Sequence, residues 1–161
     1  MKQIFLSIQK RLADNVPALQ YIDKNWGQLN IAKPPVKWPC CLMDIDSIDY
    51  SQASENTRVA EASIILTIAD CHTVRSSANA PNKEDSYAIL DVIEKVAAIL
   101  DGYRVPDTTQ ALVYTRMQKT FSDQSYDVYN LTFTTAWVEE QEKGGTVKVP
   151  PLIKVSLKLP E

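Results

Sequence analysis

The stretch Thr57-Arg58-Val59-Ala60-Glu61-Ala62-Ser63-Ile64-Ile65-Leu66-Thr67-Ile68-Ala69-Asp70 decides the fold. Every second residue from Ala60 to Ile68 is apolar, and mostly polar residues such as Glu61 and Ser63 fall between them. Side chains alternate between the two faces of a strand, so this pattern predicts a long strand with one buried face. The buried face of such a strand has to be covered by other elements of the chain.

Two stretches have the apolar spacing of amphipathic helices. Residues 2–14 form the first, which we expect to end before Pro17, because a residue preceding proline disfavours the α conformation. Residues 84–101 form the second, with Asn82 as the expected N-cap and Gly102 at the C-terminal stop. The apolar positions are Ile4, Phe5, Ile8 and Leu12 in the first, and Ile89, Leu90, Ile93, Val96, Ala97 and Leu100 in the second.

Three further strands are expected around the central one. Residues 36–45 form one, and its beginning is expected at a sheet edge or strand start because Pro39 has no N–H to donate. Residues 111–121 and 126–139 form a hairpin about the loop 122–125. One face of the last strand is shared by Tyr129, Leu131, Phe133 and Trp137. The order of elements predicts an α+β domain: an antiparallel or mixed sheet with two amphipathic helices packed on one face.

The 161 residues fit one domain, which we expect to cover residues 1–142. Residues 143–161 follow as a C-terminal strand or arm after the Gly144-Gly145 joint. Within this segment apolar residues alternate with polar ones, notably at Ile153, Val155 and Leu157. Two interpretations stay open: a closing strand of the protein's own sheet, or an arm that adds to the sheet of a neighbouring subunit.

Composition excludes several classes of protein. A content of 45% hydrophobic residues with a net charge of −3 is not that of a disordered chain. The apolar runs are too short to span a bilayer, and the N-terminus has no signal-peptide pattern, so we expect neither membrane insertion nor secretion. The isoelectric point near 5.2 and the lack of a basic stripe argue against nucleic-acid binding through a basic face. The odd number of cysteines, with two of the three adjacent, fits a reducing cytoplasm.

Candidate chemistry is sparse in this sequence. Residues 44–55 carry acids at three positions of a calcium-loop template, but Ile48 replaces an oxygen ligand and Asp49 replaces the required glycine. A looser cation site at this acidic strand end stays open. The positions of the four glycines match no phosphate-binding loop motif. His72 is the only histidine and therefore the only imidazole available as a general base. We therefore assign no catalytic residue, metal or cofactor, and expect the cysteines, Cys40, Cys41 and Cys71, to act as small buried hydrophobic residues, with His72 at a strand end.

The strand Trp38-Pro39-Cys40-Cys41-Leu42-Met43-Asp44 is similar to a Pro-x-x-Leu-hydrophobic-Asp strand of a known family. The other matching pieces are the N-terminal helix, the strand Thr57–Asp70, the helix Asp85–Leu100 that ends at Gly102, and the hairpin Arg116–Trp137 with its tip Ser122–Asp127. Together they cover roughly residues 1–140, and their order resembles that of the tail terminator and tail-completion (head–tail joining) proteins of long-tailed phages, the lambda tail terminator group.

This resemblance implies a structural protein without enzymatic activity. Members of the group form a ring, usually of six subunits, that caps the tail tube, stops its growth and joins the tail to the head. The implied partners are further copies of the chain, the tail tube and head-completion proteins. The implied location is the host cytoplasm during assembly and then the virion tail.

The candidate interface residues lie in two acidic or polar loops and in the C-terminal segment. They are Asp44, Asp46, Asp49, Asp123, Gln124, Ile153, Val155 and Leu157. Two alternatives stay open. One is a small dimeric ligand-binding or regulatory α+β domain, with a pocket near Trp26, Trp38 or Trp137. The other is a metal-dependent hydrolase that uses the aspartates of residues 44–49.

Overall fold

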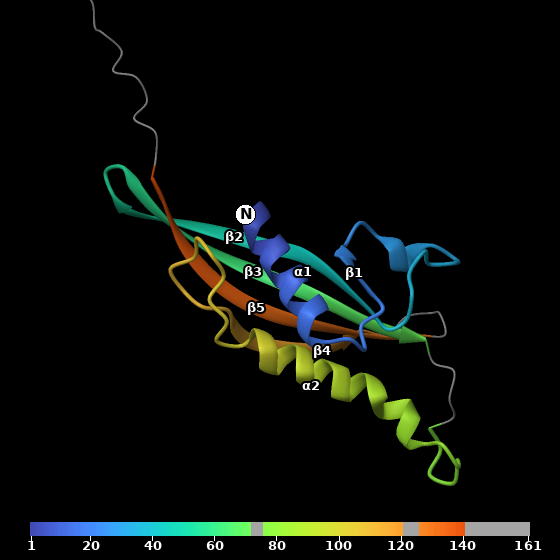
Figure 1. Cartoon of the computed structure of the whole chain (residues 1–161). Helices are drawn as coiled ribbons and strands as arrows, with labels where there is room; N and C mark the ends of the chain where they lie inside the picture. Colours follow the sequence, from blue (N-terminus) through green and yellow to red (C-terminus); the bar gives the residue numbers. More distant parts are fainter. Residues whose placement is uncertain (72–75, 121–125, 141–161) are drawn as a thin grey trace, which may run out of the picture.

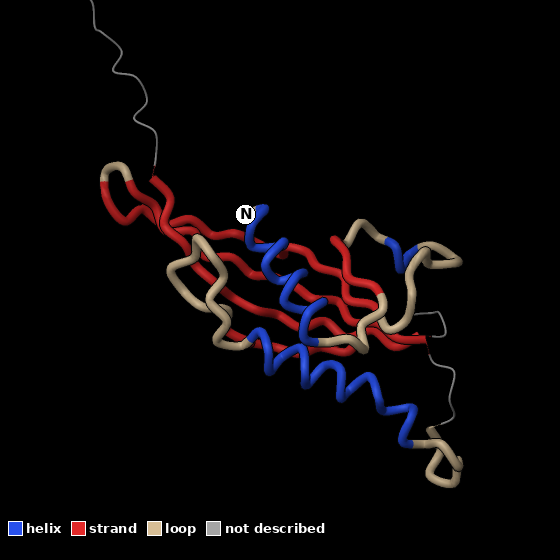
Figure 2. The backbone as a smooth tube through the Cα atoms, viewed as in Figure 1, coloured by secondary structure: helices blue, strands red, loops and turns tan. Residues whose placement is uncertain are grey.

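A long, twisted five-stranded sheet carries both α-helices on one face (Figures 1 and 2). The structure is a computed structural model, and it describes residues 1–71, 76–120 and 126–140. In chain order the elements are α1 (Lys2–Asn15), β1 (Tyr21–Lys24), the 3₁₀ helix η1 (Gln28–Asn30), β2 (Cys40–Ser54), β3 (Thr57–Cys71), the 3₁₀ helix η2 (Glu84–Tyr87), α2 (Ala88–Leu100), β4 (Val113–Thr120) and β5 (Tyr126–Glu140).

The sheet has the strand order β1-β2-β3-β5-β4, with β3 at its centre. β1 runs parallel to β2, and the other pairs are antiparallel, so the sheet is mixed. β3 and β5 pair along their whole length, from Thr57 opposite Glu140 to Cys71 opposite Tyr126. The α+β class, the mixed sheet and the two amphipathic helices confirm the predicted fold.

The main core lies between the helices and one face of the sheet. The alternate residues of β3 from Ala60 to Ile68 are buried there, as their spacing predicted. On β5 the same face holds Leu131, Phe133 and Trp137, which are at most 6% exposed. The helices contribute Ile4, Ile8 and Leu12 from α1 and Ile89, Val92, Ile93, Val96 and Leu100 from α2.

A smaller cluster covers part of the opposite face. Cys40 and Cys41 are adjacent and therefore point to opposite faces of the sheet, where each belongs to a different cluster. The second cluster is covered by the loop before β2, whose Trp38 ring lies 5.2 Å from the Tyr126 ring. The Tyr126 hydroxyl also donates a hydrogen bond to the Leu29 carbonyl. Cys40 and Cys41 thus confirm the prediction of small hydrophobic core residues, whereas Cys71, the last residue of β3, is only half-buried.

The structure corrects the strand predicted over residues 36–45. β2 begins at Cys40 and continues to Ser54, so the aspartates expected in a loop after it lie on a strand. The reason is pairing: β3 supplies a hydrogen-bonding partner along the whole polar half of β2, as far as Thr57 opposite Ser54.

The start of the second helix also differs from the prediction. Asn82 does not cap it with its side chain; its backbone carbonyl instead accepts a hydrogen bond from the Asp85 N–H at 3.2 Å. That contact belongs to the short 3₁₀ helix η2, so the α-helix itself starts at Ala88, later than residue 84. The first helix ends at Asn15, before Pro17 as predicted.

Candidate assembly surfaces

The turn between β2 and β3 projects beyond both helices, together with the end of β5 (Figure 1). We call this surface the hairpin end and define it as residues 49–61 and 136–140. Residues 49–55 are exposed throughout. Tyr50 and Val138 are large apolar residues that are 46% and 48% exposed, respectively. The hairpin end therefore presents apolar surface to solvent far from the helix layer.

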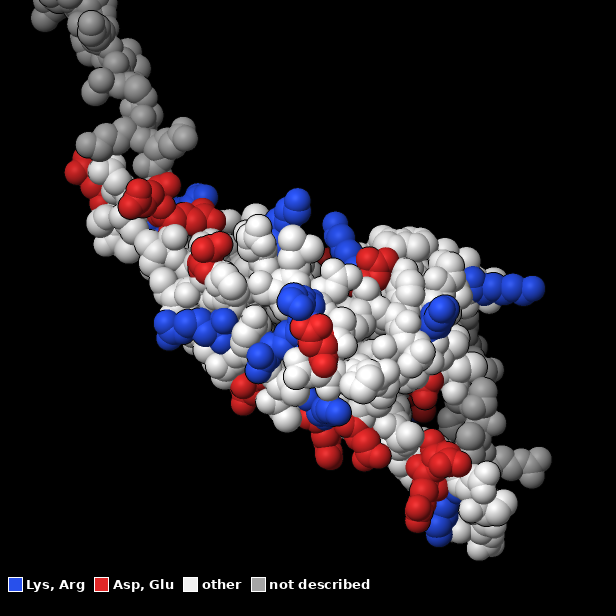
Figure 3. Space-filling model, in the orientation of Figure 1, with Lys and Arg blue, Asp and Glu red and all other residues white. Residues whose placement is uncertain are grey.

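The hairpin end is acidic, carrying five carboxylates and one guanidinium. Asp49 and Glu61 face each other directly across β2 and β3, an arrangement in which like charges repel. The guanidinium of Arg58 is bound to Glu139 at 2.7 Å and lies 4.2 Å from the centre of the Tyr50 ring. Figure 3 shows the acidic side chains gathered over this end. The surface therefore favours a cationic partner.

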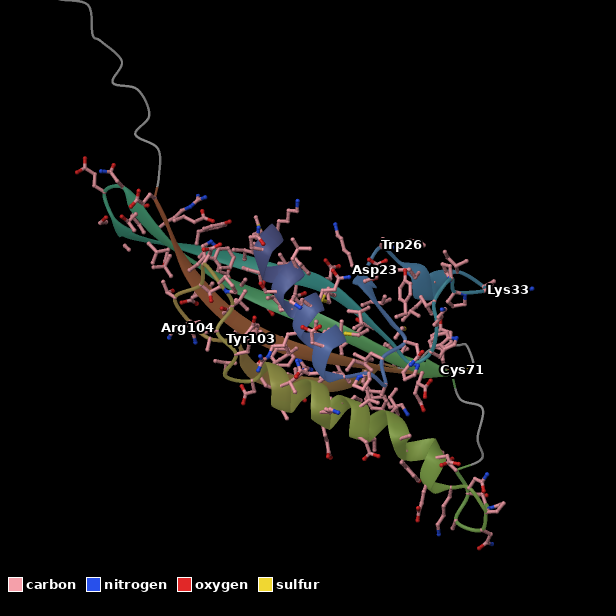
Figure 4. The ribbon with its side chains drawn as sticks, in the orientation of Figure 1. Asp23, Trp26, Lys33, Cys71, Tyr103 and Arg104 are labelled. Atoms are coloured by element: carbon pink, nitrogen blue, oxygen red, sulfur yellow. The ribbon has the colours of Figure 1, made fainter. Side chains whose placement is uncertain are left out.

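The opposite end of the sheet carries a loop of opposite charge. We call it the loop end and define it as residues 24–39. Three exposed lysines, Lys24, Lys33 and Lys37, lie in it, and no acidic residue does. Trp26 and Ile31 are 57% and 42% exposed, respectively. Figure 4 shows Trp26 and Lys33 on this loop, away from the helix layer.

The shape of the loop end is held by the side chain of Gln28, which is fully buried. Its Nε2 donates to the Lys24 carbonyl at 2.8 Å, and its Oε1 accepts from the Trp26 N–H at 2.9 Å. Gly27 adopts a φ of +92°, which an L side chain rarely tolerates. These contacts fix the backbone that carries the exposed tryptophan.

The face of the sheet away from the helices is polar over its hairpin half. A hollow of about 350 Å³ lies there, and no tryptophan lines it, so it is not the aromatic pocket expected for a ligand-binding domain. Its lining residues are Ser47, Asp49, Glu61, Ala62, Ser63, Gln110, Thr134 and Thr135.

Among the strands of the described residues, β4 forms one outer edge of the sheet, and one side of its backbone pairs with none of them. Val113 and Met117 on this strand are 39% and 49% exposed, respectively. A free edge with exposed apolar side chains is a second place where another chain can add.

The structure places only three of the predicted interface residues. Asp44, Asp46 and Asp49 are exposed along β2, and a bulge lies between Ile45 and Ser47. The candidates outside the described residues are Asp123, Gln124, Ile153, Val155 and Leu157.

The loop end was not among the surfaces predicted from the sequence. The sequence does indicate a basic surface there, because residues 24–43 contain three lysines and no carboxylate in a chain with a net charge of −3. The exposure of Trp26 was not predictable from pattern, because most tryptophans are largely buried.

The buried thiols have a perturbed acidity. Burial raises the pKa of Cys40 to about 11 and raises the pKa of Cys41 further. Both are therefore held as neutral thiols at neutral pH, and the thiolate is the nucleophilic form. Among residues 1–71, 76–120 and 126–140, no three His, Cys, Asp or Glu side chains converge as metal ligands. In the same part of the chain, no helix is both long and apolar enough to cross a bilayer.

No family model matches the sequence. A comparison with curated proteins likewise gave no match. Several solved structures resemble the chain, among them a protein from the virion of a native gene transfer agent (GTA) particle, with a TM-score of 0.56 and 11% sequence identity. The likeness covers 86% of this chain and 96% of that one. The two proteins share a fold over nearly their whole length.

Proposed function

We propose that this chain is a non-enzymatic structural subunit of a phage-like virion. Within that class, we propose a tail terminator: a ring of subunits, six by resemblance, that caps the tail tube and offers the surface to which the head joins. The proposed location is the host cytoplasm during assembly and then the virion tail.

The observation that carries this proposal is the likeness to the GTA virion chain. The likeness extends over 96% of that chain, so it involves nearly the whole fold of the neighbour and not one shared motif. The order of elements in the sequence resembles the tail terminator group independently. The two lines of support converge on the same kind of particle.

The surfaces of the molecule fit an assembly role. Exposed apolar residues lie at both ends of the sheet and along one edge, at Tyr50, Val138, Trp26, Ile31 and Met117. Large apolar side chains in clusters at a surface are typical of protein–protein contacts. Because identical subunits in a ring use two different surfaces of each copy, exposed surface at two separated places is what such a ring requires.

Electron microscopy of the purified protein, with and without the tail-tube protein of the same genome, tests the proposal. We expect rings of one size, and tubes whose lengths stop increasing when the chain is added during polymerisation. Rings that form without any effect on tube length would support self-assembly but not the capping of tail tubes. A chain that neither assembles nor binds tubes, and that is stabilised by a small metabolite, would instead support the ligand-binding alternative.

A further inference from the structure

The acidic hairpin end and the basic loop end lie at opposite ends of the same strand. β2 starts at Cys40, directly after the loop end, and finishes at Ser54 inside the hairpin end. Fifteen residues of extended strand span about 45 Å. The two surfaces of one molecule are therefore too far apart to meet each other (Figure 1).

The two ends are complementary in charge and similar in apolar content. Exposed lysines with no acidic residue form one end, and five carboxylates with one guanidinium form the other. Each end adds a large exposed aromatic residue, Trp26 at the loop end and Tyr50 at the hairpin end. Aromatic anchors inside a rim of paired charges are the usual composition of an energetically important contact.

The carboxylates that border the loop end are engaged within the chain. On the neighbouring strand ends, Asp127 is paired with Lys119 at 2.7 Å, and an oxygen of Asp70 accepts a hydrogen bond from the Cys71 N–H at 2.9 Å. Asp23 accepts a hydrogen bond from the Tyr21 hydroxyl at 2.8 Å and another from the Lys24 N–H at 2.8 Å. Among the described ion pairs, Lys24, Lys33 and Lys37 have no partner, so their charges face solvent. At the hairpin end, Arg58 neutralises Glu139, while Glu55 and Glu140 lie beside it at the exposed tip.

We propose that the loop end of one copy of this chain docks on the hairpin end of the next copy. The contact is heterologous, because it joins two different surfaces, and repetition of it closes a ring where the rotation allows. The inference rests on the proposed ring-forming function and names the two surfaces that build the ring. A second copy is the occupant because each end carries the charge that the other lacks.

Charge reversal at each end tests the contact. The loop variant is Lys33→Glu with Lys37→Glu, and the hairpin variant is Glu55→Lys with Glu140→Lys; all four side chains are exposed. The matched control is Lys2→Glu with Lys95→Glu, which changes the net charge as the loop variant does but lies on the helices. Sedimentation velocity over a concentration series at low and high salt gives the assembly state of each protein.

We expect the loop variant and the hairpin variant each to lose at least tenfold in assembly affinity, while the control assembles like the natural chain. The chain with all four reversals at the two ends should assemble again, because both charges of the contact are exchanged. An equimolar mixture of the two single-end variants should also assemble, alternating around any ring with an even number of subunits. Salt should weaken the natural assembly.

Trp26→Ala separates the apolar part of the contact from its charge. The side chain is 57% exposed in the single chain, so we expect an unchanged unfolding midpoint under monomeric conditions and an assembly at least tenfold weaker. Variants that assemble like the natural chain would overturn this interface and leave the proposed function standing. A natural chain that stays monomeric at every concentration would overturn the interface and the ring together.

Discussion

Arg58 on β3 and Glu139 on β5 are joined by two hydrogen bonds across the hairpin end. The guanidinium donates from Nε at 2.9 Å and from Nη2 at 2.7 Å to the same carboxylate oxygen, Oε2. The other oxygen accepts from the indole N–H of Trp137 at 2.8 Å. The projecting hairpin, which has no helix beneath it, is thereby tied to the central sheet.

This carboxylate gives the hairpin end a pH-dependent stability. Hydrogen bonds from Trp137 and Arg58 lower the pKa of Glu139. A lowered folded-state pKa contributes stability above the unfolded value of about 4.3, and that stability is lost as the pH falls through the folded-state value. We expect Glu139→Gln to lower the free energy of unfolding at pH 7 by about 0.5 to 1 kcal/mol, since the pair is partly exposed.

Urea unfolding at pH 7 and pH 3 measures this difference. The gap between the natural chain and Glu139→Gln should narrow from pH 7 to pH 3, because the Glu139 carboxylate becomes protonated as the pH falls. Asp14→Asn is the control, because the ion pair of Asp14 with Lys10 is well exposed on α1 and should contribute less. An equal gap at both pH values would contradict a role for the ionised carboxylate.

Substitution of Leu66 tests the assigned core at the centre of the sheet. Leu66 is fully buried on β3, between Met43 on β2 and Leu131 on β5. Leu66→Ala removes buried methyl groups and leaves a cavity, and we expect the free energy of unfolding to fall by about 3 kcal/mol. The control Leu6→Ala, at a side chain 45% exposed, should change it by less than about 0.5 kcal/mol. Similar losses in both variants would contradict the assigned core.

The main architecture was predictable because its signals are local. The period-two pattern of β3 and the helical stripes of α1 and α2 each follow from the spacing of apolar residues, and the structure buries most of those residues, with Phe5, Leu90 and Ala97 only half-buried. The second half of β2 was not predictable, because a polar strand between Asp44 and Ser54 exists only through its pairing with β3. Pairing between strands is a tertiary property and leaves no pattern within either strand.

The candidate surfaces were less predictable than the fold. Charge runs can be counted in a sequence, but which runs end up at opposite ends of one strand depends on the register of β2. Asp49 and Glu61 illustrate this point, since twelve positions separate them in sequence and the hairpin places them face to face. The sequence indicated acidic residues near a strand end. The fold places Glu61 opposite Asp49 and thereby concentrates negative charge there.

The two adjacent cysteines should be inert while the chain is folded. Because burial raises the pKa of Cys40 to about 11, the thiolate fraction at pH 8 is about one thousandth. Cys41 is fully buried in the main core and should react no faster. We expect iodoacetamide to leave both unmodified in buffer and to alkylate both in urea, as read by peptide mass spectrometry. Rapid modification in buffer would contradict their placement on the two covered faces.

Substitution of Gly102 tests the backbone conformation at the end of α2. Gly102 adopts a φ of +74°, and its N–H donates to the Leu112 carbonyl at 2.8 Å, which fixes the chain between α2 and β4. A Cβ at this position would meet no atom within 4 Å, so the cost of a substitution is that of the backbone conformation alone. We expect Gly102→Ala to lower the free energy of unfolding by about 1 kcal/mol and Gly102→Asn to lower it less, because asparagine tolerates the left-handed region better than alanine does. Thermal unfolding of the two variants beside the natural chain measures this order, and equal losses would mean that steric contact, not backbone conformation, sets the preference for glycine.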